Sequence, residues 1–185
     1  MKKLHLGCGK NILKGYINVD IDKSGNPDVI DNVITLEKFS DSSVDCIESY
    51  HLLEHLTFYE AKRALKRWYA LLVEDGLLIV ECPNFRRCLE LLYHEGNLEE
   101  ALGVKDKDLI DDQGINLALV GIYGWPPVID KNPLLQQHKW GWSPSAIMEE
   151  LKEIGFKEVK VTEHVSQTWR KAYKIRRDMR VVGRK

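Results

Sequence analysis

Two glycines near the start of the chain and an acid that follows them are the first candidates for binding a ligand. Gly7 and Gly9 come directly after the apolar run Leu4–Leu6. Glycine takes positive φ and has no Cβ, so a glycine turn that leaves a strand lets the backbone approach a ligand closely. Asp20 closes the next apolar run, where a carboxylate can accept hydrogen bonds from both hydroxyls of a ribose, and Asp22 is the second candidate. The pattern predicts a nucleotide site.

The spacing within this pattern argues against NAD. The dinucleotide fingerprint has a glycine where Ile12 stands and an acid roughly 20 residues beyond the motif. The short distance from Gly9 to Asp20 leaves room for a first helix of a turn or two at most. Asn11 stands where a third glycine is common, and asparagine tolerates a left-handed backbone. We therefore expect a compressed binding loop.

A second group of side chains offers metal or acid–base chemistry. His51, Glu54 and His55 match the pattern H-x-x-E-H, in which two histidines on a helix bind zinc and the glutamate acts as a base. A third ligand, such as His138, His164 or a carboxylate, would have to converge on the pair. The alternative is the start of a helix that packs against the glycine loop, because five common residues often match by chance. The second interpretation is preferred, and no metal is expected.

The apolar pattern predicts strands that alternate with helices, which is the arrangement of a doubly wound α/β fold. Residues 77–80 form a continuous apolar run, typical of a central strand buried on both faces. Two late segments that alternate in polarity predict an antiparallel edge on an otherwise parallel sheet. The predicted strands are residues 4–6, 16–20, 27–33, 43–49, 77–80, 159–162 and 179–182.

Two of the helices have clear sequence patterns. Apolar residues at helical spacing predict a helix from Thr57 to Glu74, with Asp75-Gly76 as its stop signal. Ser143 is a suitable N-cap for a later helix, and Gly155 is suited to end it.

Residues 96–142 lack clear periodicity and collect glycine, proline and tryptophan. We expect this segment to be a lid or substrate-binding insertion within a single domain that spans residues 1–185. Its aromatic side chains are candidates for either a substrate cradle or core packing, and the set is Tyr123, Trp125, Trp140 and Trp142.

The amino-acid composition limits the classes of molecule that this protein is expected to bind. The chain has 27 basic and 28 acidic residues, so its net charge of −1 gives no field that attracts nucleic acid or an acidic membrane. A small-molecule partner fits this balance best. Four scattered cysteines without a C-x-x-C pair fit a reducing cytoplasm. Glycines soon after Lys2 and Lys3 argue against a signal peptide or a membrane span.

The end of the chain is basic. Eight of the 16 residues from Arg170 to Lys185 are lysine or arginine. This segment has the composition of an RNA-binding edge or of a site for a phosphorylated substrate. A solvated helix and edge strand explain it more simply, because lysine and arginine protect sheet edges from aggregation. A nucleic-acid partner is therefore disfavoured.

The segments at residues 3–84 and 138–163 together resemble the small S-adenosylmethionine (SAM)-dependent methyltransferases often described as type 11. The resemblance rests, in chain order, on residues 4–11, 15–22, 43–45, 51–56, 75–84, 138–143 and 151–156. It implies a Rossmann-like methyltransferase sheet of seven strands, mostly parallel with an antiparallel edge, in an α/β/α sandwich.

The resemblance also implies a SAM site. The glycine loop would surround the methionine part of SAM, Asp20 would bind the ribose, and Ile21 would pack on the adenine. Asp31, Asn32 and Val33 would lie at the adenine edge, and residues 49–51 would border the transferable methyl group. The implied cofactor-binding residues are Gly7, Cys8, Gly9, Asn11, Asp20, Ile21, Asp31, Asn32, Val33, Ser49 and Tyr50.

Two positions depart from the family pattern, since His5 stands where an acid often positions the cofactor amino group and Asn11 replaces a glycine. His51 and His138 are the candidate catalytic residues, because imidazole can take a proton from a hydroxyl near neutral pH. The expected activity is methyl transfer to a small molecule, with a saccharide or nucleotide-sugar as a candidate acceptor. The alternatives are a methyltransferase-like binding module without activity, an RNA methyltransferase and an H-x-x-E-H zinc hydrolase.

Overall fold

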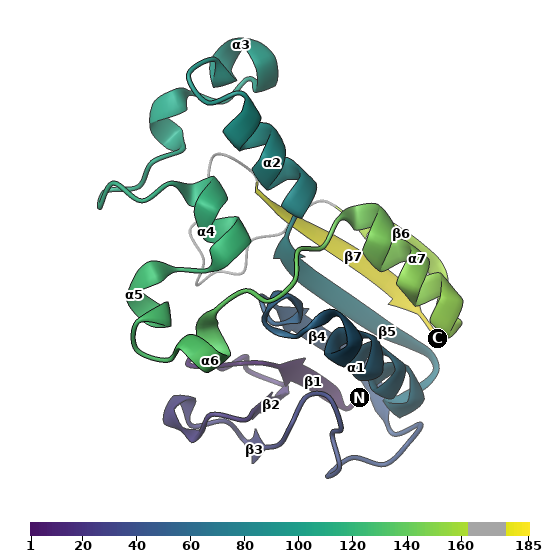
Figure 1. Ribbon diagram of the computed structural model, residues 1–185. Helices are drawn as coiled ribbons and strands as arrows, with labels where there is room; N and C mark the ends of the chain where they lie inside the picture. Colours follow the sequence, from purple (N-terminus) through teal and green to yellow (C-terminus); the bar gives the residue numbers. More distant parts are fainter. Residues whose placement is uncertain (163–176) are drawn as a thin grey trace.

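The computed structural model describes residues 1–162 and 177–185 around a seven-stranded sheet (Figure 1). The strand order is β3-β2-β1-β4-β5-β7-β6. The first five strands of this order pair in parallel, and β7 runs antiparallel to both β5 and β6. This confirms the predicted sheet, mostly parallel with an antiparallel edge. The strands are β1 (Lys3–Leu6), β2 (Ile17–Asp20), β3 (Val29–Ile30), β4 (Val44–Tyr50), β5 (Leu72–Pro83), β6 (Lys157–Thr162) and β7 (Asp178–Arg184).

Two helices, α1 (Phe58–Leu71) and α7 (Pro144–Ile154), pack on the sheet and against each other (Figure 1). Helix α1 contacts β5, and α7 contacts β6 and β7. The predicted caps of α7 are confirmed. The Ser143 side chain accepts a hydrogen bond from the backbone N–H of Ala146, and Gly155 ends the helix with φ of 119°. Such caps satisfy backbone groups that have no partner inside a helix.

The predicted end of the first helix is wrong. Helix α1 ends at Leu71, and the next residue, Leu72, already pairs with Val44 of β4. Asp75 and Gly76, expected as the stop signal, lie inside the long strand β5, where Asp75 has φ of 62°. Pairing with the sheet decided this boundary, and helical spacing alone does not report it.

The third strand is shorter than predicted. Only Val29 and Ile30 pair with β2, whereas residues 27–33 were expected. Beyond them the Asp31 carboxylate accepts hydrogen bonds from the backbone N–H groups of Asn32 and Lys38. These side chain–backbone bonds replace the ladder bonds that a longer strand would make.

The segment between β5 and α7 is made of short helices that lie at the carboxyl ends of the parallel strands (Figure 1). Most of them have four to seven residues, too few to show helical periodicity. A second, smaller core cluster, which includes Leu91 and Leu117, holds this part together. The helices are α2 (Phe85–Tyr93), α3 (Leu98–Leu102), α4 (Leu117–Tyr123), α5 (Pro126–Ile129) and α6 (Pro133–Gln136).

Among the described residues, no helix has the length and apolarity needed to cross a membrane. His164 and part of the basic C-terminal segment, including Arg170 and Arg176, lie outside the described residues.

We expect the substitution Trp68→Phe to lower the free energy of unfolding by about 1–3 kcal/mol, the cost of leaving one buried hydrogen-bonding group without a partner. The Trp68 indole is fully buried and donates a hydrogen bond of 2.8 Å to the carbonyl of Val33. Phenylalanine keeps an apolar ring but has no donor. Denaturant unfolding measures the change. The same substitution at Trp140, which is 45% exposed, should cost about 0.5 kcal/mol or less, and equal costs at the two positions would contradict the prediction.

Candidate functional site

A cavity of about 730 Å³ lies at the carboxyl ends of β1, β2 and β4. In the sheet, β1 has β2 on one side and β4 on the other, so the chain order reverses at β1. Open α/β sheets bind ligands outside the carboxyl ends of their strands at such a reversal. The lower wall comes from the loop after β1 and the end of β2, and the upper wall comes from α4, α5 and α6.

The glycine loop is built as a turn directly after β1. Gly7 and Gly9 have φ of 68° and 50°, which favours glycine at both positions. The Asp20 carboxylate ties the loop to β2, because it accepts hydrogen bonds from the backbone N–H groups of Gly9, at 2.7 Å, and of Asp22, at 2.8 Å. Within residues 7–16 the chain forms turns without a helix, so the crossover between β1 and β2 is as compressed as the spacing predicted.

Gly25 is a part of this loop assembly that sequence reasoning missed. It ends the short 3-10 helix η1 (Lys23–Gly25), which follows β2. A Cβ atom at Gly25 would lie 1.8 Å from the carbonyl oxygen of Gly9 and 3.1 Å from the nitrogen of Lys10. Only a glycine lets η1 pack this closely on the loop. The sequence shows the glycine, but the close approach arises from residues 16 positions apart.

Most of the predicted cofactor-binding residues line the cavity, and two do not. Ser49 is fully buried within β4, and the Asp31 carboxylate is engaged with backbone N–H groups away from the cavity wall. Asn11 lines the cavity and is not among the residues with positive φ, so the left-handed backbone that asparagine tolerates is not used at this position. The predicted residues on the wall are Gly7, Cys8, Gly9, Asn11, Asp20, Ile21, Asn32, Val33 and Tyr50.

Cys8 lies in the glycine loop with only 1% of its surface exposed. Burial, and then the nearby Asp20 carboxylate, raise the pKa of the Cys8 thiol to about 12. The thiol is therefore protonated at neutral pH and acts as a small apolar group on the wall.

His5, at the position where the family often has an acid, is buried in a hydrogen-bonded cluster. Its Nδ1 lies 3.0 Å from Oδ1 of Asn18, which also accepts a hydrogen bond from the backbone N–H of Leu13. Burial lowers the pKa of His5, and the contact with Asn18 only partly opposes this shift. The neutral ring donates through Nδ1 and keeps Nε2 as an acceptor, so His5 offers the cavity a lone pair in place of a negative charge.

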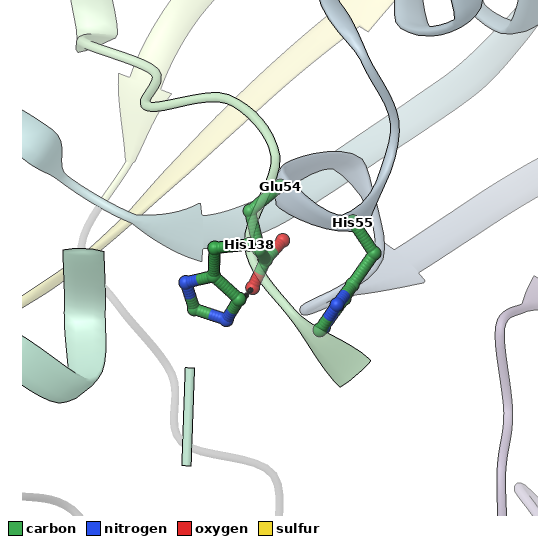
Figure 2. Close-up of side chains that lie close together, drawn as sticks. All are labelled: Glu54, His55 and His138. Atoms are coloured by element: carbon green, nitrogen blue, oxygen red, sulfur yellow. Dashed lines mark ion pairs between the residues drawn. The ribbon is translucent and has the colours of Figure 1, made fainter. Parts of the chain in front are cut away.

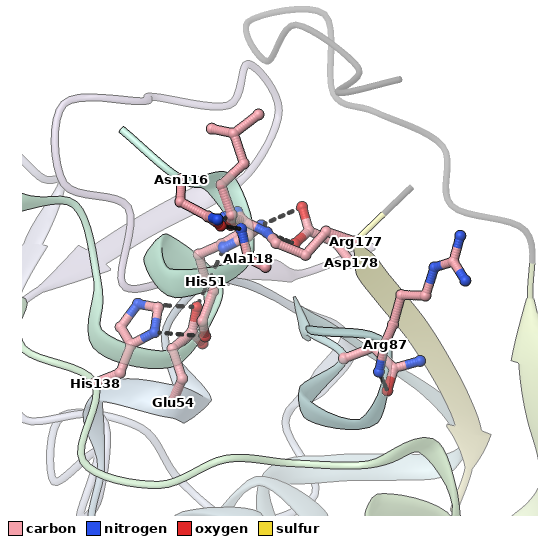
Figure 3. Close-up of polar contacts among 11 residues, drawn as sticks. His51, Glu54, Arg87, Asn116, Ala118, His138, Arg177 and Asp178 are labelled. Carbon is pink, nitrogen blue, oxygen red and sulfur yellow. Dashed lines mark hydrogen bonds and ion pairs between the residues drawn. The ribbon is translucent and has the colours of Figure 1, made fainter. Parts of the chain in front are cut away.

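His51 lies between two carboxylates at the end of β4 (Figure 3). Its Nδ1 lies 3.1 Å from Oε1 of Glu54, and its Nε2 lies 3.3 Å from Oδ2 of Asp178. Burial lowers the pKa of His51, but Asp178 and Glu54 together raise it by more, so the pKa is higher than usual. Both ring nitrogens are engaged, and the backbone is held at φ of 50°. The arrangement makes His51 a buried cation between two anions.

Glu54 joins this network to a second histidine. Nε2 of His138 lies 4.0 Å from Oε1 of Glu54 (Figure 3). The backbone N–H of Lys139 donates a hydrogen bond to the Glu54 carbonyl. Burial raises the pKa of Glu54, but His51, followed by His55 and His138, lowers it to about 2. Glu54 is therefore ionised, and it connects the end of β4 to the segment before α7.

The helix that the H-x-x-E-H pattern needs is absent from this part of the described chain. His51 precedes the 3-10 helix η2 (Leu53–His55), so the two histidines of the pattern do not share a face of an α-helix. The side chains that come together are Glu54, His55 and His138. His55 was not among the predicted site residues, and only its place in this pattern pointed to it.

The apolar upper wall comes from the segment that sequence reasoning left without structure. Val120, Trp125, Val128 and Leu135 line the cavity from short helices and their connections. Lys139 and Arg177 also reach the wall. Lys139 was missed, whereas Arg177 belongs to the basic segment that the sequence offered as a possible site for a phosphorylated substrate. The other aromatic candidates lie elsewhere, since Trp142 is buried in the core against Phe58, while Tyr123 and Trp140 are exposed and outside the wall.

Comparison with known proteins identifies the fold. Solved structures of SAM-dependent methyltransferases align with the whole chain or nearly so. One from Archaeoglobus fulgidus has 16% identity and a TM-score of 0.59, with 100% of this chain and 86% of that chain covered. One from Methanosarcina mazei has 16% identity and a TM-score of 0.59, with 100% and 92% covered. A third, from Thermotoga maritima, has 20% identity and a TM-score of 0.58, with 99% and 81% covered.

The chain therefore has the Rossmann-like fold of the class I SAM-dependent methyltransferases. No protein-family model matches the sequence, and no curated protein matches it either. The likeness lies in the three-dimensional arrangement, because identities of 16–20% leave few positions in common. A fold supports many functions, and the function depends on the residues at the site.

Proposed function

We propose that this protein is a SAM-dependent methyltransferase that acts on a small molecule. The observation that carries the proposal is the glycine loop. It leaves β1 with positive φ at Gly7 and Gly9, is tied to Asp20, and faces a cavity of about 730 Å³ at the point where the strand order reverses. The methyltransferase fold of the solved neighbours supports the same function.

The residues of the loop fit SAM. A Cβ atom built at Gly9 would meet nothing within 4 Å, so the space beside this backbone is open to a ligand. In our proposal Gly7, Cys8 and Gly9 hold the methionine part, and Asp20 accepts hydrogen bonds from the ribose. Ile21, which is 54% exposed, packs on the adenine together with Asn32 and Val33. Nε2 of His5 accepts a hydrogen bond from the amino group.

When bound, SAM supplies a methyl group on a positively charged sulfur, and transfer to a nucleophile breaks the carbon–sulfur bond and leaves S-adenosylhomocysteine. The chain contributes alignment and exclusion of water. Val120, Trp125, Val128 and Leu135 cover the cavity with apolar surface. The acceptor contacts the more polar wall near His55 and Lys139, and a saccharide or nucleotide-sugar is a candidate for it.

The two candidate catalytic histidines differ in what their nitrogens contact. Both nitrogens of His51 face carboxylates within 3.3 Å, so we propose that His51 positions Glu54 and Asp178 rather than accepting a proton from the acceptor. Nδ1 of His138 faces the carbonyl of Gly121 at 3.0 Å, which leaves the lone pair of Nε2 for a ligand in the cavity. We place the enzyme in the cytoplasm, which the four free, buried cysteines support.

Calorimetric titration with S-adenosylhomocysteine and with SAM tests the proposal. We expect both to bind with a stoichiometry of one per chain, and the Asn32→Ala variant to bind more weakly because Asn32 lines the cavity. No binding of either compound to the wild-type protein would overturn the proposal.

The substitution Gly25→Ala should weaken S-adenosylhomocysteine binding by more than about 10-fold, which is 1.4 kcal/mol. The added methyl group meets the Gly9 backbone at 1.8 Å, so the loop has to move. Overpacking of this kind also costs about 1–3 kcal/mol of stability. Lys23→Ala changes an exposed residue of the same short helix and is the control. Unchanged affinity in Gly25→Ala would show that the loop position does not matter for binding.

A further inference from the structure

Glu54, His55 and His138 bring three potential metal ligands together at the cavity. One ligand atom from each lies within 4.8 Å of the others, and Figure 2 shows the Glu54 carboxylate between the two imidazole rings. Oε1 of Glu54 and Nε2 of His138 are 4.0 Å apart. Both histidines line the cavity wall, whereas Glu54 is 2% exposed and lies behind them.

The orientation of both rings suits a metal. Nδ1 of His55 lies 3.3 Å from the carbonyl oxygen of Gln137, and Nδ1 of His138 lies 3.0 Å from that of Gly121. A carbonyl accepts only, so each ring carries its proton on Nδ1 and a lone pair on Nε2. Histidine ligands of metals are held in this way, by a hydrogen bond from the second ring nitrogen to a carbonyl or carboxylate.

The Glu54 carboxylate is the third ligand and lacks hydrogen bonds. Neither of its buried oxygens has a hydrogen-bond partner, although His51 lies at ion-pair distance from Oε1. Buried carboxylate oxygens are normally hydrogen-bonded or bound to a metal. An anion with unused lone pairs beside two imidazole nitrogens is the donor set of a cation site.

We propose that Glu54, His55 and His138 bind one divalent transition-metal ion at the acceptor side of the cavity. Two imidazole nitrogens and one carboxylate oxygen favour ions such as Zn²⁺ over Mg²⁺, which prefers oxygen ligands alone. Metal–ligand bond lengths of 2.0–2.2 Å place the ligand atoms of a tetrahedral site roughly 3.4 Å apart. The distances between the three ligand atoms, now up to 4.8 Å, would therefore have to shorten by about 1 Å when the ion binds.

Three protein ligands leave a coordination position open toward the cavity. This step rests on the proposed function: a hydroxyl oxygen of the methyl acceptor takes that position. A bound cation lowers the pKa of an oxygen ligand, so the hydroxyl would release its proton to solvent more readily, and no side chain would be needed as a general base. The ion would thus both orient the acceptor and make it more nucleophilic.

Equilibrium dialysis with Zn²⁺, and absorption spectra with Co²⁺ as the probe, test the site in the full chain. We expect one ion per chain and a Co²⁺ spectrum typical of mixed nitrogen and oxygen ligands. The variants Glu54→Gln and His55→Asn/His138→Asn should weaken Zn²⁺ binding by more than about 100-fold, because loss of an outer-shell partner alone costs 10–100-fold. His94→Asn changes the histidine that caps the C-terminus of α2, outside this cluster; it is the matched control and should bind as the wild type does.

Wild-type protein that binds no stoichiometric Zn²⁺, or a double histidine variant that binds it undiminished, would overturn the proposal. If the variants do not fold, modification of the wild type by diethylpyrocarbonate, mapped by mass spectrometry, tests the same rings. Zn²⁺ should protect His55 and His138 but not His94, and equal modification with and without the ion would overturn the site. Titration of the wild type with S-adenosylhomocysteine is separate: its failure would remove the proposed function and leave the metal site standing.

Discussion

Replacement of Asp20 by alanine is expected to weaken S-adenosylhomocysteine binding by more than about 100-fold. In the proposed complex the carboxylate accepts hydrogen bonds from two ribose hydroxyls, and hydrogen bonds to charged groups contribute about 1.5–3 kcal/mol each. Two of them correspond to at least about 3 kcal/mol, or a little over 100-fold. The variant also frees the N–H groups of Gly9 and Asp22, which Asp20 holds. Both losses act on the cofactor site, and calorimetric titration measures their sum.

The variant Asp22→Ala tests whether Asp20 or Asp22 binds the ribose. Asp22 also lines the cavity, but its carboxylate accepts hydrogen bonds from the backbone N–H and the hydroxyl of Ser24. We expect a loss below about 10-fold in this variant. A larger loss in Asp22→Ala than in Asp20→Ala would transfer the ribose contact to Asp22. Wild-type affinity in Asp20→Ala would remove Asp20 from the cofactor site.

The substitution His51→Asn is expected to lower the free energy of unfolding by about 3–5 kcal/mol, the cost of removing one partner of a buried ion pair. His51 is the cation between the buried carboxylates of Glu54 and Asp178. Without it Asp178 keeps the Arg177 guanidinium at 3.1 Å, but among the described residues Glu54 keeps only the more distant His138 ring as an ion-pair partner, at 4.0 Å, in a low-dielectric region. Asparagine is chosen because it tolerates the φ of 50° at this position, so the loss reports the charge rather than backbone strain.

Denaturant unfolding of four proteins measures this effect: the wild type, His51→Asn, Asp178→Asn and the double variant. We expect the double variant to lose less than the sum of the single losses, with a coupling of more than about 1 kcal/mol. His94→Asn removes a partly buried histidine outside this network and should change stability by about 0.5 kcal/mol or less. A loss below about 1 kcal/mol in His51→Asn would contradict the ion-pair interpretation.

The helices and strands that the sequence predicted well are those whose position depends on neighbouring residues in the chain. Helix α7 has its cap at Ser143 and its end at Gly155, as expected, because both are determined by neighbouring backbone groups. The continuous apolar run in β5 indicated a strand at the centre of the sheet, and β5 lies between β4 and β7. The two boundaries that failed, the end of α1 and the length of β3, depend on which distant strand pairs with which residue.

In the candidate site, too, the residues with local causes were predicted and those that depend on distant contacts were not. Gly7, Gly9 and Asp20 lie on one loop and the strand after it, and their residue types alone predicted a ligand there. His138 was singled out as a candidate proton acceptor and as one of several possible third ligands for the H-x-x-E-H pattern, but the sequence does not show that it lies beside Glu54, more than 80 positions earlier. The apolar upper wall was missed because helices of four to seven residues carry no periodicity.

The sequence by itself determined a parallel α/β sheet with an antiparallel edge and a compressed glycine loop that ends near an acid. These features follow from backbone conformation and from apolar spacing, which are properties of short segments. Only the tertiary structure decided that Gly25 packs on Gly9, that His51 is clamped between two carboxylates, and that Glu54, His55 and His138 converge on the cavity. Those contacts join segments brought together by the sheet order, and their energies depend on burial, which the sequence does not specify residue by residue.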